Sequence, residues 1–379
     1  MATSAIGPGF LTQTSLFTEE LVASFGFVIL ISVLLDIGAQ LNVWRIVTIS
    51  ENRAQDLSNK VFPGLGFFLA ALIAFGGLIF NIGNMAGCGL GIQVLTGLDV
   101  KTGAVVSAVI ALGIFWYKEA GKLMDGFTKF LGFIMIGLTV YIAISSHPPI
   151  AEALYRTVWP EKIDVMKIVT LVGGTVGGYI SFAGAHRLLD AGIKGKENIP
   201  LVTRSSVSGI LITATMRFVL FFAALGIVWQ GIKLAADNPA STIFQSAAGQ
   251  IGYKFFGIVM WSAAITSVVG ASYTSVSFWK TLVPAVAKNE KFIISLFIIV
   301  STIIFVTVGK PVNLLLLAGA INGIILPIAL AVILIAANKT SLMNQYRHPV
   351  VLQIIGWIVV AVMSWMGFIT IQQSIGKLL

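Results

Sequence analysis

The sequence predicts an all-α integral membrane protein, with two five-helix halves of inverted topology and an eleventh helix in one transmembrane domain over residues 1–379. Three observations predict this fold. Hydrophobic residues make up 57% of the chain and charged residues 10%, and the mean hydropathy of +0.96 is too high for a soluble domain of this length. Apolar segments of membrane-spanning length recur along the chain. Two of these segments, five apart, are interrupted by glycines.

Segments of about 17 to 25 mostly uncharged residues are long enough to cross about 30 Å of hydrocarbon. Eleven are expected, at residues 2–22, 25–48, 62–88, 102–117, 127–146, 166–192, 205–230, 254–278, 291–308, 312–336 and 349–374. The first five make up one half, at about 2–146, and the next five make up the other, at about 166–336. No soluble domain fits between them.

The first segment is interrupted at Gly7-Pro8-Gly9, where glycine and proline disfavour a helix. A helical pattern resumes from Phe10. A half-helix of the six residues before the break would span about 10 Å, which is short of half the hydrocarbon. Either the natural chain begins upstream of Met1 or this half-helix is unusually short.

The sixth segment, "IVTLVGGTVGGYISFAGAHRLLDAG", is interrupted by the run from Gly173 to Gly178. Each glycine inside a helix costs about 1 kcal/mol of helix propensity. Inverted five-helix repeats place an unwound helix at equivalent positions of each half, and the freed backbone groups form a solute site near the midplane. The alternative is that the glycines only let helices pack closely.

Basic residues are unevenly divided between the two sets of loops. Of the 24 lysines and arginines, fifteen lie in or beside the loops after even-numbered segments, Arg187 among them, eight lie in or beside the loops after odd-numbered ones, and Arg217 lies deep inside a segment. The positive-inside rule therefore predicts a multi-pass protein of the cell membrane with a cytoplasmic amino terminus and an external carboxyl terminus. The net charge of +9 is explained by the basic residues that set this orientation, so no nucleic-acid partner is expected.

The motifs at the two breaks resemble those of the natural-resistance-associated macrophage protein (NRAMP) family, and the resemblance covers nearly the full length. The family's first helix carries Asp-Pro-Gly-Asn where this chain has Gly7-Pro8-Gly9-Phe10, and its sixth helix carries Met-Pro-His where this chain has Gly177-Gly178-Tyr179. The stretch "AAITSVVGASYTS" is similar to the family's hydroxyl-rich eighth helix. The resemblance implies a leucine-transporter-like fold and secondary transport by alternating access.

The resemblance also implies that metal-carrying members hold manganese or iron with the Asp, Asn and Met that Gly7, Phe10 and Gly177 replace here. Such ions need anionic oxygen or imidazole ligands, so no metal site is expected. The expected solute is a small carboxylate such as an amino acid or 5-oxoproline, and relatives with Gly-Pro-Gly are often encoded beside 5-oxoproline-metabolising genes. Proton-coupled transport of a divalent metal ion through an altered site is the alternative, and a channel is the second alternative.

A carboxylate is expected at the half-helix amino termini, where backbone amides and the helix dipole favour an anion. The residues expected to bind it are Gly7, Gly9, Phe10, Thr12, Gly177, Gly178, Tyr179 and Ser181. Three of them supply hydroxyl groups, and the glycines leave room for a compact organic body.

Asp36, His186, Thr266 and Ser267 are expected to couple transport to protons or sodium. Asp36 is an intramembrane acid, which either relays protons or is hydrogen-bonded within the packing. His186 follows the second break and is either a proton relay or a helix-end histidine. Thr266 and Ser267 resemble a hydroxyl pair of sodium sites in some leucine-transporter-fold proteins, or else bond back to their own helix.

Three further polar residues lie inside the expected helices. Arg217 either pairs with Asp36, holds a substrate carboxylate or snorkels to the membrane surface. Asn81 and Asn84 share one face of the third helix and either line the pathway or bond to neighbouring helices.

Other functional classes lack their motifs in this sequence. It contains no Gly-x-Ser-x-Gly or His-Glu-x-x-His, and its three histidines are scattered, so an enzyme is not expected. It also lacks a Gly-x-x-x-x-Gly-Lys loop for ATP coupling. The expected partners are the lipid bilayer and a small molecule or ion, with no cofactor, and the sequence does not predict an oligomeric state.

Overall fold

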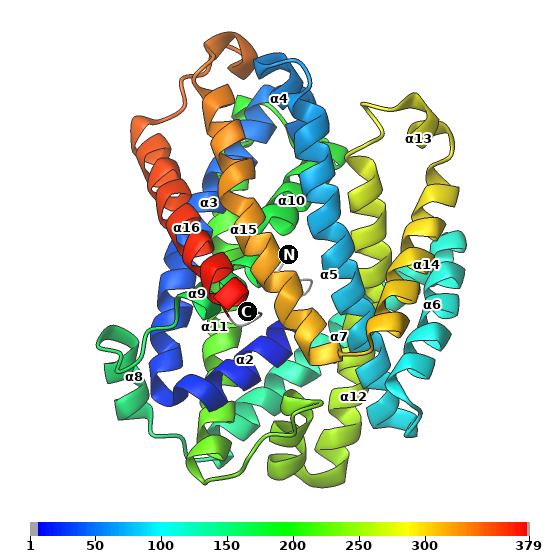
Figure 1. The fold of residues 1–379 in the computed structure, drawn as a ribbon, viewed down its shortest axis with the longest axis vertical. Coiled ribbons are helices and arrows are strands. Elements are labelled where there is room, and N and C mark those ends of the chain that lie inside the picture. The colour runs from blue at the N-terminus through cyan, green and yellow to red at the C-terminus, as the bar shows by residue number, and fades with distance from the viewer. Residues whose placement is uncertain (1–6, 377–379) are drawn as a thin grey trace.

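The computed structural model describes residues 7–376, with the side chains of all but 118–123, 125, 128, 129 and 374–376. Every regular element in this part of the chain is a helix (Figure 1). In chain order the elements are α2 (Pro8–Leu21), η1 (Val22–Ser24), α3 (Phe25–Ser50), α4 (Ala54–Val61), α5 (Leu65–Thr96), α6 (Val100–Trp116), α7 (Lys118–Ser145), α8 (Ile150–Val158), α9 (Val165–Thr175), α10 (Gly178–Asp190), η2 (Lys196–Asn198), α11 (Ile199–Trp229), α12 (Pro239–Ser277), α13 (Pro284–Lys288), α14 (Glu290–Val308), α15 (Pro311–Ala337), η3 (Thr340–Met343) and α16 (Val350–Gly376).

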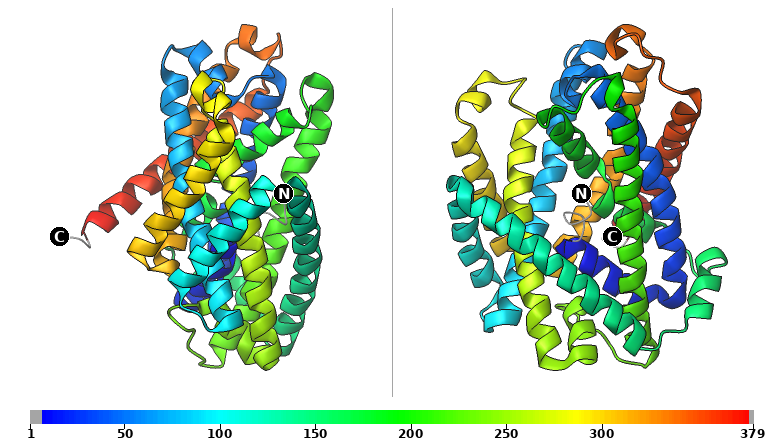
Figure 2. Two further views of the ribbon diagram at one scale, coloured as in Figure 1. Left: turned by 90° about the vertical axis from the view of Figure 1, so that its right-hand side faces the viewer. Right: turned by 180° about the vertical axis from the view of Figure 1, so that it is seen from behind.

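The two halves repeat the same order of long helices. The half that begins with α2 continues through α3, α5, α6 and α7, and the half that begins with the broken pair α9 and α10 continues through α11, α12, α14 and α15. The short helices α4 and α13 lie at one end of the molecule, while α8 lies at the other (Figures 1 and 2). Between these ends α2 starts in the middle of the bundle, and α9 and α10 meet there.

The eleven predicted segments overlap helices, except that residues 2–6 of the first segment lie outside the described residues, and fewer helices are full crossings. Within the described chain, eight spans are long and apolar enough to cross a membrane, and α2 and α3 count together as one of them. A ninth is added if Phe130–Ser145 and Ile150–Val158, bent by 105°, form one span. Because α2 has only 14 residues, it extends about 21 Å and cannot cross alone. The 17 residues of α6 lie at the lower limit of the spanning length, and this helix is not among the eight spans.

The eighth predicted segment, 254–278, is the later part of a longer helix. α12 begins at Pro239 and bends at Ala248 and Gly249. Gly249 has φ +59°, a conformation that glycine adopts without steric cost. The apolar pattern is interrupted at this bend, although the helix continues through it. The predicted segment therefore begins 15 residues after the start of the helix.

Two apolar clusters form the core, one on each side of the two breaks. One cluster joins α3, α9, α10, α15 and α16 around buried rings such as Phe25 and Phe182. The other joins α5, α6, α12 and α14, where the rings of Phe244 and Phe256 stack at 5.2 Å between centroids. Tyr179 belongs to the first cluster and Phe10 to the second, so the breaks lie at the boundary between them.

The last helix, α16, is fixed to α3 by a buried amide and imidazole. The amide nitrogen of Asn42 donates to the carbonyls of Gly38 at 2.8 Å and Leu352 at 2.9 Å. Its Oδ1 faces Nε2 of His348 at 2.8 Å, so Nε2 carries the hydrogen and donates it. His348 is 3% exposed, and burial next to Arg45 lowers its pKa from 6.5 to about 4.

This contact predicts acid sensitivity of the α3–α16 packing. Since the pKa of His348 is lowered on folding, its contribution to stability is complete above pH 6.5 and is lost as the pH falls towards 4, by at most about 3 kcal/mol. We expect the difference in unfolding midpoint between the wild type and His348→Gln to change between pH 7.5 and pH 4.5, with the wild type losing more. Thermal unfolding in detergent measures it, and a pH-independent difference would contradict this prediction.

Candidate functional site

The first predicted break lies at the start of α2, and the half-helix expected before it lies outside the described residues. Gly7 precedes the helix with an extended backbone (φ −102°, ψ −176°), and Pro8 occupies the first turn, where its missing N–H costs nothing. The amide of Leu11 donates to the Gly7 carbonyl at 3.2 Å. The dipole of α2 therefore directs its positive end into the middle of the bundle.

At the second break, α9 ends at Thr175 and α10 begins at Gly178. The amides of Val176 and Gly177 both donate to the Val172 carbonyl at 2.9 Å. The amide of Tyr179 donates to Oδ1 of Asn322 at 3.0 Å, and Nδ2 of Asn322 donates to the carbonyls of Gly76 and Ala318. The Tyr179 amide is thus hydrogen-bonded to a side chain of α15, whereas it was expected to be free to bind an anion.

Glycines near the second break allow backbones to approach. A Cβ at Gly173 would overlap backbone atoms of Gly319 and Gly323 on α15, and one at Gly178 would overlap Ile325. At the first break, a Cβ at Gly87 of α5 would overlap the Pro8 ring. The glycine run therefore serves close packing as well as interrupting the helix, and Gly178 faces α15.

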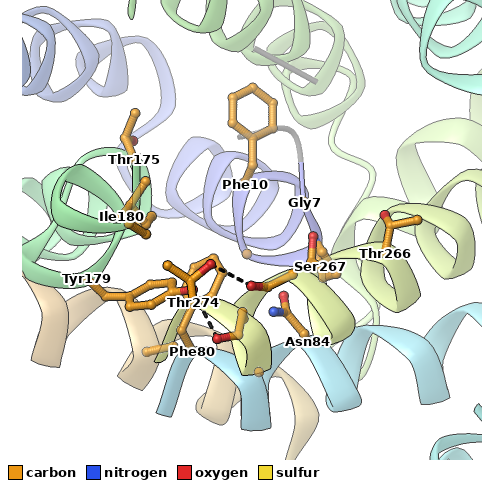
Figure 3. Close-up of a pocket in the computed structure, with 18 of the residues that line it drawn as sticks. Gly7, Phe10, Phe80, Asn84, Thr175, Tyr179, Ile180, Thr266, Ser267 and Thr274 are labelled. Atoms are coloured by element: carbon orange, nitrogen blue, oxygen red, sulfur yellow. Dashed lines mark hydrogen bonds between the residues drawn. The ribbon is translucent and has the colours of Figure 1, made fainter. Parts of the chain in front are cut away.

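A cavity of about 540 Å³ lies between the two breaks. From the break it extends along α10 to Arg187 and Leu188 and along α12 to Thr274, towards the end that carries α4 and α13. Figure 3 shows Asn84 and Ser267 next to the start of α2, with the Phe10 ring on the other side of that helix.

Six of the residues predicted from the sequence line this cavity: Gly7, Gly9, Phe10, Tyr179, Thr266 and Ser267. The Tyr179 hydroxyl donates to the Ala271 carbonyl at 3.2 Å, which fixes the ring against α12. The Thr266 hydroxyl is directed to its own helix, at 2.9 Å from the Ser262 carbonyl.

The other six lie outside the lining: Thr12, Asp36, Gly177, Gly178, Ser181 and His186. The Ser181 hydroxyl donates to the Val176 carbonyl at 2.7 Å, and Nε2 of His186 accepts from the Ala54 amide at 3.3 Å. The His186 ring also packs on Phe278, with centroids 4.1 Å apart. His186 therefore joins α10 to α4.

The sequence analysis did not select Gln13, whose carboxamide reaches the cavity from α2. Gln13 is 1% exposed, and its Oε1 has no hydrogen-bond partner in the part of the chain that the structure describes. A Cβ at Gly174 of α9 would lie 2.6 Å from this oxygen, and a Cβ at Gly319 of α15 would lie 2.6 Å from Nε2. The two glycines thus make room for a carboxamide at the point where α2, α9 and α15 converge.

Arg187 is the one formally charged residue among the described lining residues. The sequence analysis assigned it to the cytoplasmic surface. Its guanidinium extends from α10 towards α12, where a Cβ at Gly270 would lie 2.8 Å from an Nη atom. The described residues contain no group of three or more His, Cys, Asp or Glu side chains placed to hold a metal ion.

Ion pairs and a hydrogen bond join α2 to its neighbours at the opposite end of the bundle. Lys167 of α9 contacts Glu20 of α2 at 2.7 Å and Asp164 at 2.5 Å. The neighbouring Glu19 accepts from the Leu234 amide, in the α11–α12 connection, at 2.8 Å. These contacts hold α2 against α9 on the side of the cavity away from α4.

Comparison with known proteins identifies relatives over the full length. A family model described as natural resistance-associated macrophage protein-like matches residues 1–373. The uncharacterized membrane protein YcsG of Bacillus subtilis is 59% identical over 378 residues, which cover 100% of this chain and 94% of that protein. The divalent metal cation transporter MntH of Aeromonas hydrophila is 20% identical over 301 residues, which cover 74% of this chain and 71% of that protein.

Solved structures of transporters share the fold. A mutant of the Eremococcus coleocola manganese transporter matches with a TM-score of 0.74 at 15% identity, over 100% of this chain and 85% of that one. MhsT in complex with L-phenylalanine matches with a TM-score of 0.62 at 15% identity, over 98% and 96%. The predicted all-α, leucine-transporter-like fold is confirmed.

The backbone contacts predict a ranking of glycine substitutions. Gly173→Ala must separate α9 from α15 and should lower the free energy of unfolding by about 3 kcal/mol. Gly174→Ala meets only the end of the Gln13 side chain, so its cost should stay below about 1 kcal/mol. Thermal unfolding in detergent measures both, with Gly113→Ala, which meets nothing within 4 Å, as the control. Equal midpoints for all three variants would disprove the proposed backbone contact.

Proposed function

This chain belongs to the natural resistance-associated macrophage protein-like family, and we propose that it is a secondary transporter that carries a small solute by alternating access. The observation that carries the proposal is the cavity between the two helix breaks, which continues along α10 and α12 towards the end of the bundle that carries α4. Half-helices that meet at the midplane are the usual solute site of inverted-repeat transporters.

The described state faces the end that carries α4. At the other end, the Lys167–Glu20 ion pair and the Glu19 contact hold α2 in place. Exposure of the site on that side requires α2 and α9 to move apart, which breaks these contacts. The excess of basic residues in the loops at the α4 end supports a cytoplasmic position for that end, and we therefore assign this state as inward-facing.

A divalent metal ion is the solute that the comparisons favour. The structures similar to this chain include a manganese transporter, and a distant relative is a divalent metal cation transporter. In this chain the ligands would be neutral oxygens: the carboxamides of Gln13 and Asn84, the Ser267 hydroxyl and carbonyls at the end of α9. Carbonyl oxygens and retained waters suit hard ions such as Mn²⁺ and Mg²⁺.

Arg187 favours a second candidate, a small organic carboxylate such as an amino acid or 5-oxoproline. Its guanidinium lines the cavity, matches the geometry of a carboxylate and repels a divalent cation. This candidate rests on the chain's own lining and receives no support from the comparisons.

Uptake into proteoliposomes separates the candidates. The purified protein is given ⁵⁴Mn²⁺ or a ¹⁴C-labelled carboxylate, either L-alanine or 5-oxoproline, with and without the same unlabelled solute inside. Saturable manganese uptake that no carboxylate alters supports the metal candidate. Saturable uptake of a labelled carboxylate that manganese does not alter supports the carboxylate candidate. Flux that does not saturate and shows no counter-transport would identify a channel.

The carboxylate candidate predicts a large effect of removing the charge at Arg187. Arg187→Gln should raise the KM for 5-oxoproline about 10- to 100-fold, the loss of a charge-assisted hydrogen bond of about 1.5 to 3 kcal/mol. Lys194→Gln is the matched control, because Lys194 is exposed near the same end and does not line the cavity. A KM that Arg187→Gln leaves unchanged would rule out this role.

The inward-facing orientation predicts which loops are cytoplasmic. In a Cys88→Ala background, which removes the single buried cysteine, a cysteine at Lys194 should react with an impermeant maleimide only from the cytoplasmic side. A cysteine at Lys162 should react only from outside. Labelling of whole cells and inverted vesicles measures both, and the reverse pattern would invert the topology.

A further inference from the structure

Asp36 of α3 and Arg217 of α11 are opposite charges buried inside the bundle. Their exposed fractions are 1% and 2%. Both lie in the interior of long helices, Phe25–Ser50 and Ile199–Trp229, far from either helix end. Because an unpaired charge inside a membrane is costly, Arg217 needs a nearby partner, and Asp36 is either ionised as that partner or neutralised by a proton.

The two charges interact without direct contact. They act electrostatically on each other, but they are farther apart than the 4.0 Å of an ion pair. Among the described residues, Oδ1 of Asp36 and both Nη atoms of Arg217 have no hydrogen-bond partner. The attraction of a buried ion pair repays the desolvation of its charges only when the two groups are in good contact and their remaining donors and acceptors are hydrogen-bonded. An arrangement in which the guanidinium contacts the carboxylate would therefore satisfy both groups better than the separated one.

Charges on the surrounding helices have partners elsewhere. Lys167 of α9 contacts Glu20 and Asp164, and His186 of α10 lies beside α4 near Arg53. On α8, Arg156 pairs with Glu152 and Glu161. Among the described residues, Arg217 is therefore the charged group that faces Asp36.

Phe10 connects this pair to the cavity. The Arg217 guanidinium lies over the Phe10 ring, 4.5 Å from its centroid, and the cation–π attraction holds it there. Phe10 directly follows the first break and lines the cavity (Figure 3). A movement of the start of α2 that shifts the Phe10 ring therefore also changes the position of the guanidinium relative to Asp36.

We propose that Asp36 and Arg217 form the ion-coupling site of the transporter, in which Asp36 binds one proton while Phe10 holds Arg217 away and releases it when Arg217 reaches the carboxylate. On binding, a proton from water forms an O–H bond with a carboxylate oxygen, and the pair changes from neutral to a net charge of +1. On release, the proton returns to water and the guanidinium donates to the carboxylate. The proposal rests on the transport function proposed above.

The test measures protons and solute together. Proteoliposomes with a pH gradient are given ⁵⁴Mn²⁺ or ¹⁴C-5-oxoproline, and internal pH is followed with pyranine. Wild type should show gradient-driven uptake of one of these probes with a fixed proton-to-solute ratio. Asp36→Asn should lower the rate of uptake driven by the pH gradient. The loss should be at least about 10-fold larger than the loss of solute counterflow measured at equal pH on both sides. Asp237→Asn, an exposed acid in the α11–α12 connection, is the matched control and should retain the wild-type ratio.

Two further variants keep the test decisive if Asp36→Asn does not fold. The double variant Asp36→Asn/Arg217→Gln removes both charges and should show the same selective loss. Phe10→Leu keeps an apolar side chain but removes the ring face, and should lower the proton-to-solute ratio. Wild-type ratios in the folded variants, or equal loss of counterflow and gradient-driven uptake, would overturn the coupling role. Transport of neither probe by wild type would instead contradict the proposed function.

Discussion

Backbone groups inside a membrane must find partners within the protein, and this constraint governs the structure around both breaks. At the second break the partner is Asn322. Its carboxamide accepts from the Tyr179 amide and donates to the carbonyls of Gly76 and Ala318, so it joins α10, α5 and α15. Without that side chain, the start of α10 would present an unpaired amide to an apolar interior. The interruption of the helix is thus stable only because α15 supplies the missing bonds.

The close approach of α15 to the break has consequences for packing. Gly173 and Gly178 carry no side chain because α15 occupies the space where one would lie. Gly174 and Gly319 leave room for the Gln13 carboxamide, and Gln13 therefore projects from α2 to the same point. Small residues at the breaks thus bring three helices together, and the remaining space between the two apolar clusters is the cavity. The same glycines that weaken the helix define the site.

Much of the fold could be predicted from the sequence, since composition and hydrophobic length locate the helices, and Gly-Pro-Gly and the glycine run locate the breaks. The roles of individual residues could not. Asn322 is an isolated amide in an apolar helix, a signal of a buried hydrogen bond, but its partner amide at Tyr179 is 143 residues away. Gly178 was predicted to line the cavity and instead faces Ile325, because sequence does not show which side of a half-helix a neighbour covers. Arg187 looked like a surface anchor since it lies near the end of α10, where the cavity opens.

The most direct measurement asks whether the cavity is the pathway and which side it faces. A single cysteine at Thr266, in the Cys88→Ala background, lies on α12 in the cavity wall. An impermeant maleimide added from the α4 side should react with it and block uptake, and a transported solute should slow the reaction. Reaction only from the α8 side, or a rate that no transported solute changes, would contradict an inward-facing solute pathway between the two helix breaks.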